Sequence, residues 1–301
     1  MDVRYSETKA TTIAVLATIV LLLSGGEGYP IGMSAEPGGL VIQHIKPGEP
    51  YDIEAKTGLH LKILNQSSEQ RSYRVSVASP EQLGITRWTE GYSPIPDPRW
   101  FYLEPTEIEI APQSSGYARM FIKIPDKREY FNQHWVVALA IESIPKRGEI
   151  LSLALKPVYY LETESREDIA ARTNEPLGLA PTVLECPVTA PGQDQSRILC
   201  GEMKIYNGDS RAHTYTINSE VPSLMASKQK VSPSPGFTWL EHPDTVMVTE
   251  EHPTVKPGKT GTVGVLLVTT PGKTSQHSNR ESLLWVSPDG GMARFIRIQC
   301  K

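Results

Sequence analysis

The chain has 301 residues, of which 39% are hydrophobic and 21% are charged, so it can form a packed core and is not disordered throughout. Its 30 lysines and arginines against 34 aspartates and glutamates give a net charge of −4, without the positive excess typical of nucleic-acid-binding proteins. The 25 prolines and 23 glycines are scattered between short apolar runs, which favours many turns and strands over long helices. The length predicts about two domains.

An apolar run from Ile13 to Leu23 follows two basic residues, Arg4 and Lys9, and precedes a stretch of small residues. This order is typical of a secretory signal peptide, and we expect cleavage after Gly26, so that residues 1–26 form the signal. The run is shorter than the roughly 20 residues that a spanning helix needs. An uncleaved membrane anchor and a buried helix are the alternatives. Cleavage predicts an extracytoplasmic protein (periplasmic, on the cell surface or secreted), which touches a membrane only if the signal stays attached.

From residue 40 onward the sequence is typical of short strands. Alternating apolar and polar residues predict strands with one buried face at 60–64, 73–77 and 120–124. Uninterrupted apolar runs at 135–141 and 150–155 are typical of central strands in a sandwich. We therefore expect an all-β protein.

A long loop, 79–99, is rich in proline and aromatic residues and leads directly into an aromatic triplet. Loops longer than about 12–15 residues in a compact domain are often functional. Aromatic side chains on a proline-stiffened loop can stack on a sugar or anchor a protein partner. The alternative is that they fold back over the end of the sandwich. The candidate binding residues are Trp88, Tyr92, Trp100, Phe101 and Tyr102.

The three cysteines, Cys186, Cys200 and Cys300, are too few for a disulfide-scaffold protein. Cys186 and Cys200 flank a segment whose centre, 190–194, has the composition of a turn. Two apolar arms joined by a turn would place these thiols on adjacent antiparallel strands, so we predict a Cys186–Cys200 disulfide and an unpaired Cys300. The alternative is three small buried residues. Zinc is not expected, because there is no C-x-x-C and no neighbouring histidine.

Features of the first half recur in the same order in the second half. A strand ends at Asn65 and again at Asn207, and a tyrosine follows each asparagine by eight residues, at Tyr73 and Tyr215. A Leu-Glu step and then a Pro-containing turn before a long apolar strand follow in both copies. We therefore predict two homologous units, at 38–160 and 181–301, joined by a linker at 161–180.

The repeated pattern resembles PapD-like and major-sperm-protein-like domains over most of both units. The resemblance rests on Leu61-Lys62-Ile63-Leu64-Asn65 before Tyr73-Arg74-Val75, on the step from Leu103 to Pro105, and on Pro112 to Gly116 before Phe121-Ile122-Lys123-Ile124-Pro125. It implies two tandem immunoglobulin-like β-sandwiches. Periplasmic pilus chaperones of that superfamily also have two domains, so the resemblance implies chaperoning of pilus or surface-fibre subunits as one candidate function.

Motifs of catalysis are missing from the sequence. Gly208-Asp209-Ser210 has ordinary turn composition, and the Gly-Lys-Thr triplets at Gly258 and Gly272 lack the earlier glycine that a phosphate loop needs. The repeated Glu-His pairs at 241–242 and 251–252 are more typical of solvated loop ends than of a metal site. We predict no enzyme activity, no cofactor and no metal.

The sequence thus favours a non-catalytic extracytoplasmic protein with a structural or assembly role, acting through protein–protein contacts. Exposed edge strands of a sandwich can accept a partner's strand through main-chain hydrogen bonds. A pilus-type chaperone is one alternative, which a basic pair in the cleft between the units would favour. A carbohydrate-binding module is another, which coplanar exposed rings within 79–102 would favour. No nucleic-acid partner is expected.

Overall fold

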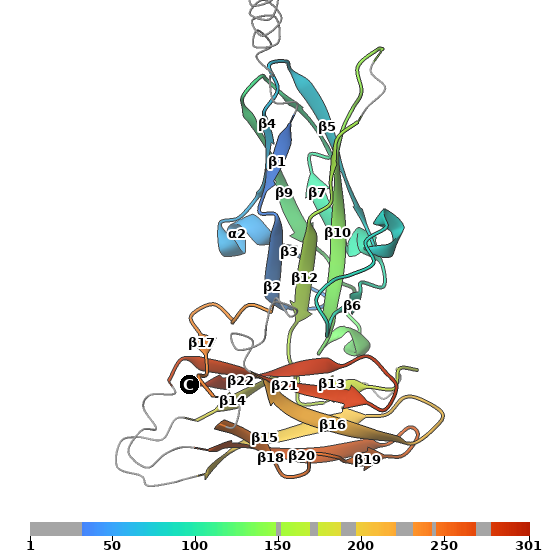
Figure 1. The fold of residues 1–301 in the computed structure, drawn as a ribbon, viewed down its shortest axis with the longest axis vertical. Helices are drawn as coiled ribbons and strands as arrows, with labels where there is room; N and C mark the ends of the chain where they lie inside the picture. The colour runs from blue at the N-terminus through green and yellow to red at the C-terminus, as the bar shows by residue number, and fades with distance from the viewer. Residues whose placement is uncertain are drawn as a thin grey trace, which may run out of the picture.

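A computed structural model describes residues 32–148, 152–168, 174–187, 197–220, 231–242, 245–268 and 278–301. The predicted signal at 1–26 and the predicted turn at 190–194 lie outside these ranges. Within the described residues, no helix has the length and apolarity required to cross a bilayer. The architecture is all-β, as predicted, with strands gathered in two stacked sandwiches (Figure 1).

The first unit is a sandwich of two sheets with an apolar core between them. One sheet has the order β1-β4-β9-β3, with β7 also on β9, and the other has the order β2-β12-β10-β5-β8, with β6 and β11 also on β10. Its elements are β1 (Met33–Glu36), β2 (Gly39–Ile45), β3 (Tyr51–Asp52), α2 (Ile53–Thr57), β4 (Leu61–Asn65), β5 (Arg71–Ala78), η1 (Glu81–Leu83), β6 (Ser93–Pro94), η2 (Pro98–Trp100), β7 (Phe101–Glu104), β8 (Glu107–Ile110), β9 (Ser115–Ile122), η3 (Arg128–Tyr130), β10 (His134–Ser143), β11 (Ala154–Leu155) and β12 (Val158–Thr163).

The second unit repeats this plan with a core of its own. Its sheets have the orders β13-β15-β20-β18 and β14-β22-β21-β16-β19, with β17 also on β21. Its elements are β13 (Gly178–Ala180), β14 (Val183–Cys186), β15 (Arg197–Tyr206), β16 (His213–Glu220), β17 (Thr238–Trp239), β18 (Val246–Val248), β19 (Thr254–Val255), β20 (Thr260–Val268), β21 (Arg280–Pro288) and β22 (Arg294–Cys300).

Strand pairing shows that the two units have one topology. In each unit an early strand, β2 or β14, pairs in parallel with the last strand, β12 or β22. Strand β12 continues through the first three residues of the predicted linker, and β13 occupies its last three. The repeat inferred from the sequence is therefore present in the sheets, while the domain boundaries 38–160 and 181–301 stay a prediction.

The two repeated asparagines occupy equivalent places and make the same contacts. Asn65 ends β4 and Asn207 follows β15, and both side chains are fully buried. Each side-chain amide donates to the carbonyl four residues later, at Glu69 (2.7 Å) and Arg211 (2.7 Å). Each also donates to a carbonyl of the strand opposite, in β8 or β19, and each Oδ1 accepts from the backbone N–H two residues on. Each asparagine thus ends its strand and holds the following turn closed.

The disulfide between Cys186 and Cys200 is present, with a Cα–Cα distance of 4.3 Å, but the predicted placement on adjacent antiparallel strands is wrong. Strand β14 pairs with β22, whereas β15 pairs with β13 and β20. Because Cys186 ends β14 in one sheet and Cys200 lies in β15 in the other, the bond ties the two sheets of the second unit together. Cys300 is a free, buried thiol, and burial raises its pKa to about 12.

Replacing Asn65 by alanine should destabilise the first unit by about 2–4 kcal/mol, because several buried carbonyls lose their donor. Urea unfolding monitored by circular dichroism measures this free energy. Asn207→Ala should cost a similar amount, and Ser68→Ala, at an exposed neighbouring turn position, should change the free energy by less than about 0.5 kcal/mol. An Asn65→Ala variant as stable as the wild type would contradict the role of this side chain.

The second unit should lose stability as the pH rises above neutrality, because of a histidine held between two carboxylates. His213 is 2% exposed at its side chain, and its ring nitrogens lie 2.8 Å from Asp209 Oδ2 and 2.6 Å from Asp289 Oδ1. Hydrogen bonds to Asp209 and then Asp289 raise the pKa of His213 above its ordinary value near 6.5.

A raised folded-state pKa stabilises the protein fully below the unfolded-state pKa, and this stabilisation disappears as the pH rises through the folded value. Unfolding free energies measured between about pH 6 and pH 9 should therefore fall in the wild type relative to His213→Gln. His252→Gln, at an exposed position, is the matched control. A constant difference between wild type and His213→Gln across this range would contradict the prediction.

Candidate partner-binding site

An apolar layer joins the two units where the second sandwich lies across the end of the first (Figure 1). Phe295 of β22 contacts Tyr92 at a ring-centroid distance of 5.5 Å, His134 at 4.3 Å and Trp285 at 5.1 Å. Tyr92 and His134 belong to the first unit, so these rings pack across the junction. The buried members of the layer are Tyr92, Val136, Val231, Leu283, Trp285, Ala293 and Phe295.

Gly91 permits this close approach of the two units. Its φ is +87°, which L side chains rarely adopt, and a Cβ there would lie 2.5 Å from Phe295 Cδ1. A larger residue would therefore both strain the backbone and push the Phe295 ring away.

A buried ion cluster lies beside this layer and spans both units. Arg297 of β22 donates from Nε to Glu162 Oε2 (2.7 Å) and from Nη2 to Glu162 Oε1 (2.6 Å), while Nη1 bonds Glu281 of β21. The side chains of Arg297 and Glu281 are 0% exposed and that of Glu162 is 5% exposed. Glu162 also accepts from Tyr92 (2.5 Å) and Gln43 (2.9 Å). Each Glu162 oxygen is thus satisfied by donors from both units.

These contacts keep Glu162 ionised despite its burial. Burial raises the pKa of Glu162, but the charge of Arg297 and its hydrogen bonds outweigh that effect and lower the pKa to about 2. Burial lowers the pKa of His134 to about 4, so its imidazole is neutral at physiological pH. The cluster therefore has one cation facing two carboxylates, with a neutral ring beside it.

Asn132 fixes the segment that connects the units. Its Nδ2 donates to the carbonyls of Arg166 (3.0 Å) and Asp168 (3.1 Å). Its Oδ1 accepts from the N–H of Arg166 (2.8 Å) and of Thr182 (3.3 Å). One side chain of the first unit thereby holds both the connecting segment and the approach to β14.

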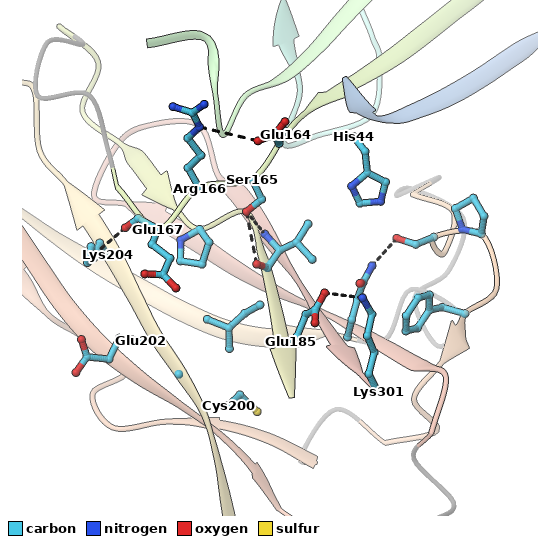
Figure 2. A pocket seen from close by; sticks show the side chains of 18 residues that line it. His44, Glu164, Ser165, Arg166, Glu167, Glu185, Cys200, Glu202, Lys204 and Lys301 are labelled. Atoms are coloured by element: carbon cyan, nitrogen blue, oxygen red, sulfur yellow. Dashed lines mark hydrogen bonds and ion pairs between the residues drawn. The ribbon is translucent and has the colours of Figure 1, made fainter. Parts of the chain in front are cut away.

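A pocket of about 730 Å³ opens at the junction, between the first unit, the connecting segment and the β14–β15 edge. Figure 2 shows its side chains converging from these elements. His44 reaches it from a bulge in β2, where the residue adopts a left-handed φ of 57°. The cations of the pocket are engaged: Lys301 with Glu185, Lys204 with the Glu167 carbonyl (2.7 Å), and Arg166 with the Phe131 ring (3.5 Å).

An open sheet edge lies in the first unit at residues 152–156. Ser143 N–H donates to the Leu153 carbonyl and Leu139 N–H to the Pro157 carbonyl, so the odd-numbered residues bond β10. The backbone groups of Ala154 and Lys156 consequently point outward. Strand β2 pairs with this edge only from Val158 onward. Leu153 is 39% exposed on the open part. The expectation of a central strand at 150–155 is therefore wrong within the described residues.

The predicted aromatic residues do not form one exposed platform. Tyr92 and Phe101 are both 1% exposed, Tyr92 in the junction and Phe101 in the first core against Tyr159. Trp88 is half-buried and donates to the Tyr92 carbonyl. Trp100 packs on Tyr130 and Trp135, and Tyr102 stacks on Phe121 at 5.2 Å. In these contacts the rings pack against neighbouring side chains, and partner binding by the set stays a prediction.

Sequence reasoning missed the ion cluster, although a signal for it exists. Arg297 interrupts the apolar run Phe295 to Ile298, and Glu162 follows the apolar run Tyr159 to Leu161. A single charge inside an otherwise buried strand requires a partner. That pattern identifies both residues as candidates for buried ion pairs, but it does not identify them as partners of each other.

Comparison with known proteins finds similar chains among solved structures. No protein-family model and no curated protein matches the chain. Among solved structures, it is similar to a PapD-like domain of human CEP192 (10% identity, 54% of this chain and 96% of that one, TM-score 0.33). It is also similar to the E. coli chaperone DraB (11%, 90% and 97%, 0.31) and to the Salmonella enterica SafB chaperone in complex with SafA pilin (11%, 89% and 95%, 0.31). With TM-scores this low, the fold assignment rests on the strand topology described above.

Arg297→Met should destabilise the protein by about 3–5 kcal/mol, because it leaves Glu162 and Glu281 buried without a cation. Guanidinium unfolding measures the loss. Arg74→Met is the matched control, since Arg74 pairs with Glu107 at a side chain 57% exposed and should cost less than about 1 kcal/mol. Equal costs for the two variants would show that the cluster does not hold the junction.

Proposed function

We propose that this chain is a non-catalytic, extracytoplasmic protein that binds a protein partner by adding the partner's strand to β11. The observation that carries the proposal is the open edge at 152–156, where the outward N–H and C=O groups of Ala154 and Lys156 lie beside the exposed Leu153 side chain. Main-chain groups supply affinity in strand addition, and alternate side chains supply selectivity. The Cys186–Cys200 disulfide supports an oxidising compartment.

A pilus-type chaperone is the narrower form of this proposal, and the fold and the open edge are compatible with it. The pocket at the junction does not favour it further, because Lys204, Lys301 and Arg166 are already engaged by neighbouring groups. The burial of Tyr92 and Phe101 does not favour a carbohydrate-binding module. The broader function, an assembly or structural role through strand addition, is therefore the one that we adopt.

Ala154→Pro tests the edge directly. Proline removes an N–H that β10 does not use, so the sandwich should remain intact while a partner loses a ladder hydrogen bond and meets the proline ring. We expect the amount of partner captured by the tagged chain, expressed in its own host and quantified by mass spectrometry, to fall at least tenfold, about 1.4 kcal/mol.

Glu109→Pro is the matched control. It places the same substitution at an outward-facing position of β8, on the opposite edge of the same sheet. Equal thermal midpoints would establish that both variants are folded. Capture that is unchanged by Ala154→Pro, or reduced equally by Glu109→Pro, would refute strand addition at β11.

A further inference from the structure

An exposed apolar ridge crosses one sheet of the second unit. In the strand register, Leu199 of β15 is opposite Leu266 of β20, and Leu266 is opposite Met247 of β18, so these three side chains share one face. Leu199 is 60% exposed and Met247 is 40% exposed. The outer face of an antiparallel sandwich ordinarily has polar residues, so a row of three apolar side chains indicates a contact surface.

The ridge faces away from the first unit. Leu283 and Trp285 of β21 and Phe295 of β22 form the junction layer, so the other sheet of the second sandwich is the outer one. Figure 1 shows β15, β18 and β20 on that far side. The ridge is therefore open to a partner without disturbance of the junction or of the edge at 152–156.

The rows of residues on either side of the ridge carry opposite charges. On one side, Arg197 is opposite Val268, and on the other side, Glu202 is opposite Gly264. Arg197 and Glu202 are exposed, and within the described part of the chain neither side chain forms an ion pair. In Figure 2 the Glu202 carboxylate points away from Glu185 and Lys301, although Glu202 borders that pocket.

We propose that this face binds the same face of a second copy of the chain, about a two-fold axis that runs along the ridge. Rotation about that axis places each strand over its own copy with the direction reversed. The ridge then packs on the ridge, and Arg197 of one copy lies over Glu202 of the other. Val268 of one copy lies over Gly264 of the other, and the glycine has no side chain. Each contact occurs twice, as in an isologous interface.

The charges beside the ridge favour a second copy over an unrelated partner. Among the described residues, the cation and the carboxylate that flank the ridge are each without an ion-pair partner in one chain, and the two-fold arrangement pairs them. Sheets packed face to face with nearly aligned strands form a common and well-packed arrangement. Because the ridge has few apolar side chains, we expect a weak dimer with a dissociation constant on the order of 10–100 µM.

Sedimentation equilibrium of the full chain between about 2 and 200 µM tests the proposal. The weight-average mass should rise from that of one chain toward that of two. Leu199→Asp should raise the dissociation constant at least tenfold. Tyr117→Asp, at a residue 53% exposed on the first unit, should leave it unchanged. A mass that stays monomeric throughout, or a dimer that persists in Leu199→Asp, would overturn the proposal.

A charge exchange tests the axis itself. Arg197→Glu alone and Glu202→Arg alone should each weaken the dimer several-fold, because like charges then face each other. The double variant should restore most of the wild-type affinity, since each new glutamate faces a new arginine. Circular dichroism would establish that all variants are folded. Failure of the double variant to recover affinity, when both single variants weaken the dimer, would overturn the two-fold geometry.

Discussion

The buried contact of Arg297 with Glu162 and Glu281 determines how the two sandwiches can lie relative to each other. Removing three charges from water costs several kcal/mol per ion, and only close, well-oriented partners offset that cost. Here the guanidinium bonds Glu162 of the first unit through two nitrogens and Glu281 of the second unit through a third. A shift of one unit against the other would leave a buried charge unpaired. The cluster therefore permits one relative arrangement, and the rings around Phe295 fill the space beside it.

Because the junction is fixed, the difference between covered strand edges and an open strand edge is informative about binding. The side chain of Ser165 accepts from Val183 N–H (2.9 Å) and lies 3.5 Å from the Val183 carbonyl, so it covers the outer edge of β14 as a neighbouring strand would. Strand β2 likewise covers β12 from Val158 onward. No such cover reaches Ala154 and Lys156 among the described residues. Because sandwiches commonly protect their edges, an edge left open in a rigid protein supports a binding role.

The repeat was predictable because it is local. Asn65 and Asn207 each combine a strand, a turn and a tyrosine eight residues later, and these spacings depend only on one strand and the short connection that follows it. The disulfide was predictable as a pair, but its crossing between sheets depends on β14 pairing with β22, more than 100 residues later. The burial of Tyr92 was not predictable for the same reason: Phe295 and Trp285, which pack with it, belong to the other unit. Pairing over such distances leaves no periodic trace in the sequence.

Native-state hydrogen exchange measures most directly whether the cluster makes the two units one rigid body. The N–H groups of Arg297, Thr163 and Asn132 lie beside the junction and donate to the carbonyls of Thr182, Gln133 and Glu164, whereas that of Leu139 belongs to the first core. If the junction is as stable as the cores, its amides should exchange with an opening free energy close to that of Leu139, which corresponds to global unfolding. Junction amides that exchange through openings several kcal/mol easier than that of Leu139 would show that the units move independently and would contradict this account.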